Sequence, residues 1–319
     1  MKDGNKKKQI EKNHFKFDKI MKLLKGIYIG IAVCLFTSCY EDYKEDYDTS
    51  VAYFYNQELT RSFVVNEVYE IKVGITMGGK RFSEANETVG YNIDETLLTG
   101  TELTLLPTEY YTLSNPSQFE VHKGDFDGNI TITINPSFFN DPLALSGGYA
   151  LPFRLTDTSL DALLEEKEVL VVQLKYEAAF FGHYYHNGAT IAKDALGDEI
   201  SALSSVYHQE EPVTNDVNNW TLSTLSSNIL ATSGISNLLD SETNRLFFDI
   251  VVDNDGSVTI GSNPESTIDV SQDGTCSYDT SKKEFYLNYS YTLDGNNFFA
   301  TDTLIYRNRI LDGVNQWNN

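Results

Sequence analysis

The chain has 319 residues, with 24 basic and 46 acidic side chains and a formal net charge of −22 at pH 7. Nucleic-acid binding depends on lysine and arginine displacing the counterions of the phosphate backbone, so this acidic balance excludes nucleic acid as an expected partner. The length suggests about two domains of roughly 100–200 residues each.

Residues 1–38 have the order of a bacterial lipoprotein signal peptide. Basic residues lead into an apolar run over residues 26–38, which is followed directly by Cys39. These 13 residues are fewer than the about 20 that a helix needs to span a bilayer. Small residues before a cysteine are typical of a cleavage site. We expect the Cys39 sulfur to carry the lipid, with palmitate among its chains, and an uncleaved signal anchor is the alternative.

Residues 39–50 are predicted to form an acidic tether. The segment is rich in Asp, Glu and Tyr and lacks the apolar spacing of a packed element. Nine lysines and three acidic residues precede it, so the chain from Cys39 onward would carry a net charge of about −28. Such a surface gains nothing from anionic headgroups, and attachment to a membrane would therefore depend on the lipid. Met1 and Met21 are both suitable starts of the signal.

Residues 51–177 are predicted to form a β-sandwich. Apolar and polar side chains alternate with a period of two, most strictly over residues 130–134, as in strands with one buried face. Gly-Gly and Asp-Gly turn signals interrupt these runs at short spacing, which favours antiparallel sandwich or barrel domains. Helical signals are sparse: residues 157–166 fit a short turn of helix, and residues 218–230 are ambiguous between helix and strand.

Residues 178–319 are predicted to form a second β domain. A strand over residues 168–176 closes the first domain, and we place the joint near residues 177–180. The clearest hairpins of the second domain turn at residues 253–256 and 293–297, where Asp-Gly or Gly-Asn dipeptides separate apolar strands. A chain of such meanders closes most simply as a small up-and-down barrel, because closure removes exposed strand edges.

Cys276 is the cysteine left without an intramolecular partner. Cys34 would leave with the signal and Cys39 would carry the lipid, so the sequence contains no disulfide framework. We expect Cys276 to be a small buried side chain and the stability of the protein to come from core burial.

Four aromatic residues are candidates for ligand binding. Sugar binding requires flat aromatic faces for the apolar face of a pyranose and a few polar groups for its hydroxyls. Trp220 and Trp317 both have asparagine neighbours, which favours exposure, and Tyr184 and Tyr185 are suited to line a barrel mouth. The alternative is ordinary packing, with the two tryptophans in or against the core and the tyrosines in a strand.

No metal, cofactor or catalytic site is predicted. His183 and His186 are three residues apart, on opposite faces of a strand, whereas zinc requires convergent ligands. Residues 253–257 resemble the opening of a calcium loop, but its twelfth position is Pro264 instead of Glu, and a hairpin turn explains them. The sequence has no hydrolase or phosphate-binding motif, and adjacent acidic pairs give no reason to face each other at glycosidase separations.

Three stretches, together with the signal, carry a resemblance: residues 106–113, 149–155 and 302–310. With them the chain resembles Bacteroidetes cell-surface lipoproteins of glycan-utilisation loci. These have an immunoglobulin-like N-terminal domain of formerly unknown function and a lipocalin-like C-terminal domain. The resemblance implies an all-β fold, with an immunoglobulin-like β-sandwich over residues 51–177 followed by an antiparallel lipocalin-like β-barrel over residues 178–319.

The resemblance also implies a function. It indicates a non-catalytic surface protein, lipid-anchored in the outer membrane and facing the cell exterior, that captures oligo- or polysaccharide for import. Its partners would be a glycan and outer-membrane importer components. The alternative is a structural or adhesive lipoprotein, such as a fimbrial subunit or a matrix-binding adhesin, since these are also lipidated, acidic and β-rich. A hydrolase with an unrecognised site is a third reading.

Overall fold

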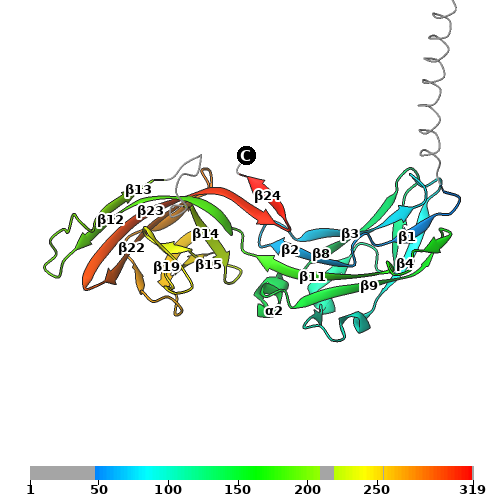
Figure 1. The fold of residues 1–319 in the computed structure, drawn as a ribbon, viewed down its shortest axis with the longest axis horizontal. Coiled ribbons are helices and arrows are strands. Elements are labelled where there is room, and N and C mark those ends of the chain that lie inside the picture. The colour runs from blue at the N-terminus through cyan, green and yellow to red at the C-terminus, as the bar shows by residue number, and fades with distance from the viewer. Residues whose placement is uncertain (1–46, 209–218, 254, 318–319) are drawn as a thin grey trace, which may run out of the picture.

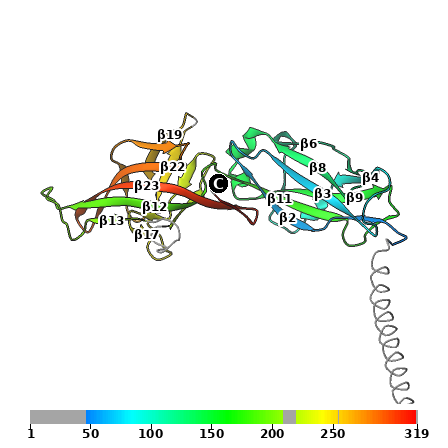
Figure 2. The same cartoon turned by 90° about the horizontal axis from the view of Figure 1, so that it is seen from above.

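The computed structural model describes residues 47–208, 219–253 and 255–317. They form two β-rich halves that lie end to end along the long axis of the molecule (Figures 1 and 2). The predicted signal peptide, the lipidation site Cys39 and most of the tether lie outside the described residues. No helix in the described part of the chain has the length and apolar character needed to span a membrane.

The N-terminal half is a sandwich of two sheets. One sheet has the strand order β10 (Ala162–Leu163), β1 (Val51–Tyr53), β3 (Glu70–Gly78), β8 (Asp127–Ile134) and β6 (Tyr111–Leu113). The other has the order β2 (Glu58–Val64), β11 (Val169–Glu177), β9 (Tyr149–Thr158), β4 (Glu87–Ile93) and β7 (Gln118–Val121), with β5 (Thr104–Leu105) beside β9.

Alternating burial explains how the two sheets of the sandwich pack. In β8 every second side chain is buried, and β11 follows the same pattern, as expected for strands with one face in a core. The core is rich in aromatic rings at edge-to-face angles, including Phe54 with Phe119 and Phe63 with Phe138. Short helical turns lie between the strands: η1 (Glu95–Leu98), η2 (Thr108–Tyr110), η3 (Pro136–Asn140) and α2 (Pro142–Leu145).

The C-terminal half is one antiparallel sheet that closes on itself. Its strands follow the order β13 (Ser205–Tyr207), β12 (Gly182–Lys193), β14 (Asn219–Thr224), β15 (Ile229–Ala231), β18 (Phe248–Val252), β19 (Ser257–Ser262), β21 (Cys276–Asp279), β22 (Glu284–Leu293), β23 (Asn296–Leu311) and β24 (Val314–Trp317). The additional pairing of β12 with β23, from His183 opposite Asn308 to Lys193 opposite Asn297, closes the barrel. Beside this path, β20 (Val270–Gln272) pairs with β22, and β16 (Gly234–Ile235) pairs with β17 (Leu238–Leu239).

This architecture confirms the predicted fold class, an all-β chain with a sandwich followed by an antiparallel barrel. Both predicted hairpins are present as β18–β19 and β22–β23. The second turns at Asp294 and Gly295, whose φ values of 51° and 77° are the positive values that a tight hairpin turn requires. Cys276 is buried and free, as expected.

Two local predictions are resolved in favour of strands. Residues 157–166 form no helix: they contain the end of β9 and all of β10, which pairs in parallel with β1, because a sheet edge offers this segment backbone partners that an isolated helical turn lacks. The ambiguous segment 218–230 contains β14 and the start of β15. Residue 218 itself lies outside the described residues.

The two halves are connected by side chains as well as by the chain itself. Val64 of β2 belongs to the buried cluster of the barrel, together with Ala178 and Phe181 of the joint. The Asp312 carboxylate accepts a hydrogen bond from the Ser62 backbone N–H at 3.1 Å. In Figure 1, β24 lies on one side of this joint and α2 on the other.

Candidate functional site

The structure places Trp220 inside the barrel, which corrects its prediction as a ligand-binding residue. Its side chain has no exposed surface. It stacks on the His186 ring, with centroids 3.8 Å apart, and meets Phe248 edge-to-face. In β14 the side chains of Trp220 and Leu222 point inward, so the polar neighbour Asn219 did not indicate an exposed tryptophan.

Tyr184 and Tyr185 are neighbours on β12 and therefore point to opposite faces of the sheet. Tyr184 is buried, its hydroxyl donates to the Phe180 carbonyl at 2.8 Å, and its ring meets Tyr306 edge-to-face. Tyr185 is partly exposed on the outer face, where the Arg307 guanidinium lies 5.8 Å from its ring centroid. Only Tyr184 contributes to the pocket described next.

Trp317 is half exposed, at 50% of its surface, and lines a pocket at the joint. This pocket, here called the aromatic pocket, has a volume of about 430 Å³. Its walls combine aromatic rings with charged and amide groups, and it is lined by Glu67, Ala179, Phe180, Tyr184, Tyr278, Thr280, Lys283, Tyr306, Arg309, Gln316 and Trp317.

The residues that line the aromatic pocket come from separate elements. Glu67 comes from the turn after β2, Tyr278 from β21, Tyr306 and Arg309 from β23, and Trp317 from β24. The strand β24 is held in place by its antiparallel pairing with the end of β23, after a turn at Asp312 and Gly313 with φ values of 49° and 80°. No local sequence pattern joins these residues, which explains why sequence reasoning found only Trp317 and Tyr184.

Arg309 organises the polar side of the pocket. Its Nη2 donates to the Glu67 carboxylate at 2.7 Å, and its Nε donates to the Gln316 side-chain oxygen at 2.7 Å. The Tyr306 hydroxyl donates to the Gln316 carbonyl at 3.3 Å. Burial raises the pKa of Tyr278 to about 12 and also raises the pKa of Tyr306.

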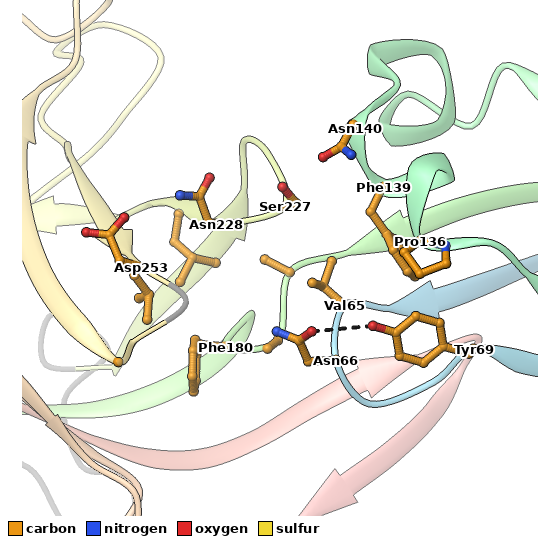
Figure 3. A pocket seen from close by; sticks show the side chains of 15 residues that line it. Val65, Asn66, Tyr69, Pro136, Phe139, Asn140, Phe180, Ser227, Asn228 and Asp253 are labelled. Carbon is orange, nitrogen blue, oxygen red and sulfur yellow. Dashed lines mark hydrogen bonds between the residues drawn. The ribbon is translucent and has the colours of Figure 1, made fainter.

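A second pocket lies on the other side of the linker residues Ala179 and Phe180 and is shown in Figure 3. This amide pocket has a volume of about 530 Å³. Figure 3 shows that side chains from both halves of the protein surround it. It is lined by Val65, Asn66, Tyr69, Pro136, Phe139, Asn140, Ala178, Ala179, Phe180, Ser227, Asn228, Leu230, Val252, Asp253 and Gly256.

The aromatic rings of the amide pocket are used in packing. Phe139 is 4% exposed and meets Tyr69 and Tyr176 edge-to-face. The Tyr69 hydroxyl donates to Asn66 at 3.3 Å, the contact marked in Figure 3. Of the two pockets, the aromatic pocket therefore has the exposed tryptophan face on which a flat ligand can stack.

A buried polar cluster occupies the barrel interior around Asp302. The Tyr289 hydroxyl donates to Asp302 Oδ2 at 2.5 Å, and the Tyr207 hydroxyl donates to Oδ1. His186 Nε2 lies 3.0 Å from Oδ2, but the ring is not aligned for a hydrogen bond. The nearby Trp220 indole N–H has no acceptor among the residues that the structure describes. None of these residues lines either pocket, so the cluster is part of the core.

The two histidines of β12 lie in different environments. His186 is fully buried, whereas His183 is half-buried and contacts the Thr221 hydroxyl at 3.0 Å through Nδ1. Burial, together with the nearby Arg307, lowers the pKa of His183. Within the described ranges, no cluster of three or more His, Cys, Asp or Glu side chains is arranged to hold a metal ion.

Comparison with solved structures finds a fold similar to that of a Bacteroides protein. A family model for a "-like, N-terminal domain" matches residues 42–161, which include most of the sandwich. No curated protein matches the sequence significantly. The solved structure of a Bacteroides ovatus protein of unknown function superposes with a TM-score of 0.65 at 18% identity, over 86% of this chain and 98% of that chain. This similarity shows a shared two-part fold.

Two further Bacteroides ovatus structures are more distant. A multidomain protein that includes DUF1735 is 11% identical, covers 83% of this chain and 94% of its own, and has a TM-score of 0.39. A candidate carbohydrate-binding protein is 13% identical, covers 79% of each chain, and has a TM-score of 0.29. At these TM-scores neither structure supports an argument about the function of this chain.

Proposed function

We propose that this protein is a non-catalytic surface lipoprotein that binds oligo- or polysaccharide in the aromatic pocket and holds it for import across the outer membrane. The observation that carries the proposal is the half-exposed Trp317 beside Tyr278 and Tyr306, in a pocket that also contains charged and amide groups.

The chemistry of this pocket suits a sugar ring. The apolar face of a pyranose stacks on a flat aromatic side chain, and its hydroxyls exchange hydrogen bonds with polar groups on the rim. Trp317 offers such a face, while the Gln316 amide and the Lys283 ammonium are polar groups of the same pocket. Loss of an aromatic anchor of this kind typically costs 2 kcal/mol or more of binding free energy.

The carboxylate content of the pocket favours binding over hydrolysis. Glu67 is the one carboxylate among the described residues that line it, and this side chain is paired with Arg309 at 2.7 Å. Glycoside hydrolysis generally uses two carboxyl groups on either side of the scissile bond. The proposal therefore assigns capture to the pocket and leaves chemical conversion to other proteins.

The remainder of the proposal concerns location. Cys39 would carry the lipid that anchors the protein in the outer membrane, with both halves facing the cell exterior next to importer components. Growth with an alkyne-labelled palmitate should label the protein, and Cys39→Ser should abolish the label and release the protein from the membrane fraction. An unlabelled wild-type protein recovered from the cytosol would remove this part of the proposal.

Binding is tested by affinity electrophoresis against a panel of polysaccharides. Changing Trp317 to Ala should lower the affinity for a polysaccharide that retards the protein by about 30-fold, or about 2 kcal/mol. Tyr55→Ala is the matched control, because Tyr55 is 73% exposed and lines neither pocket. Asn228→Ala reports on the amide pocket.

The variants separate the possible outcomes. Unchanged retardation of folded Trp317→Ala, together with a loss in Asn228→Ala, would move the site to the amide pocket. If no polysaccharide of the panel retards the protein, this result would count against glycan capture as the function.

A further inference from the structure

Basic side chains gather around the aromatic pocket, although the protein as a whole is strongly acidic. Lys283 and Arg309 line the pocket, and the Arg307 guanidinium lies 5.2 Å from the ring centroid of Trp317. The whole chain has a net charge of −22. An accumulation of cations at the one exposed tryptophan of the described residues is therefore a local departure from the average surface.

These charges are not all cancelled by nearby carboxylates. Glu67 and Arg309 neutralise each other at 2.7 Å. Lys283 is exposed, its ammonium lies 5.7 Å from the ring centroid of Tyr306, and it forms no ion pair with any residue that the structure describes. Of the carboxylates next to it, Asp279 contacts Lys282 and Glu284 accepts the Tyr286 hydroxyl. Lys283 therefore remains available to a ligand.

Screening makes the local charges more important than the overall charge. At physiological ionic strength the Debye length is about 8 Å, so acidic residues elsewhere on the surface are largely screened from a ligand in the pocket. Lys283 lines the same pocket as Trp317, so a ligand stacked on that ring is exposed to the charge of this ammonium. A negative group on the ligand would thus be attracted by the pocket.

We propose that the aromatic pocket selects sugars that carry an anionic group, a carboxylate or a sulfate ester, with Lys283 as the residue that pairs with this group. The proposal rests on the proposed function and narrows its ligand class. In this arrangement Trp317 supplies stacking for any pyranose, whereas Lys283 distinguishes a charged sugar from its neutral counterpart.

The test uses pairs of oligosaccharides that share a backbone and differ in charge. To test the carboxylate, the affinity for oligogalacturonates is compared with the affinity for their methyl-esterified forms. To test the sulfate ester, the affinity for carrageenan oligosaccharides is compared with the affinity for agarose oligosaccharides. Isothermal titration should give an affinity about fivefold higher for at least one anionic member than for its neutral partner. The difference should shrink as salt rises, since exposed charges are screened.

Lys283→Gln should bring the charged and neutral members of a preferred pair within about twofold of each other, while affinity for the neutral member is retained. Lys282→Gln is the matched control, because the adjacent Lys282 lies outside the pocket and pairs with Asp279. Trp317→Ala should weaken both members equally.

Equal affinity for the charged and neutral members of both pairs would overturn the selectivity while leaving glycan binding intact. Preserved selectivity in Lys283→Gln would overturn the role of this lysine. Binding of neither the charged nor the neutral members, at any salt concentration, would instead count against the proposed function.

Discussion

Asp302 illustrates what a single buried carboxylate requires of its neighbours. Two tyrosine hydroxyls, from Tyr207 and Tyr289, donate to its oxygens, and the His186 ring lies beside it. The pKa of both tyrosines is raised in this cluster. Burial is the larger cause, and the negative charge of Asp302 is the second. These phenols therefore remain donors, and each donor depends on the same acceptor.

Asp302→Ala should lower the free energy of unfolding by about 3–5 kcal/mol, because it leaves buried donors without their acceptor. Urea denaturation followed by circular dichroism measures this loss. Asp198→Ala, at an exposed carboxylate on the same half, should change the value by no more than about 0.5 kcal/mol. Equal effects of the two variants would show that the cluster is not a determinant of stability.

The two tryptophans show the limit of sequence at the residue scale. Both have asparagine neighbours, yet Trp220 has no exposed surface and Trp317 is 50% exposed. Composition around a residue does not determine which face of a strand points to the core, because that depends on register with neighbouring strands. The prediction for Trp317 named a residue of the aromatic pocket, and the one for Trp220 named a core residue.

At the scale of elements, hairpins were the most predictable feature. Asp-Gly dipeptides mark tight turns because both positions can adopt positive φ, and Asp294-Gly295 adopts 51° and 77°. The Asp312-Gly313 turn has the same chemistry, and it places β24 against the end of β23. This last hairpin carries Gln316 and Trp317 to the pocket.

Ending the chain after Leu311 should abolish glycan retardation while the barrel stays folded. Among the described strands, β24 pairs only with the last residues of β23, whereas the barrel closes through the β12–β23 pairing from residue 183 to 193. Affinity electrophoresis and thermal melting measure the two properties. Val314→Ala, at another exposed residue of β24, should retain binding. Retained binding in the truncated protein would exclude β24 from the site.

At the scale of the whole molecule, each half has its own buried core, and the joint adds contacts between them. The cores are separate clusters, although Val64 of β2 is part of the barrel cluster and Val68 packs against it. Both pockets lie at this joint and share Ala179 and Phe180. The position of the pockets is therefore a property of how the two halves meet.

Alkaline pH should destabilise both halves. Burial raises the pKa of Tyr91 and Tyr149 in the sandwich, and of Tyr278 and Tyr291 in the barrel, from 10.0 to about 12. A raised pKa in the folded state means that this stability is fully present below pH 10 and is lost as pH rises through 12. The urea midpoint should fall between pH 10 and 12.

Tyrosine absorbance at 295 nm, recorded in the same titration, tests this assignment. Buried phenols should ionise together with unfolding. Tyr291→Phe should reduce the pH dependence, whereas Tyr55→Phe, at an exposed ring, should leave it unchanged. A midpoint that stays constant up to pH 12 would contradict the prediction.

The local sequence was sufficient to predict the secondary-structure class and the hairpin turns, because period-two alternation and turn conformation are local properties. It did not determine that Phe180, Tyr278, Tyr306 and Trp317 meet in one pocket, or that Trp220 lies inside the barrel. Those outcomes depend on strand register, barrel closure and the docking of the two halves. These involve residues far apart in the chain, and a shift of one residue in register exchanges the inner and outer faces of a strand.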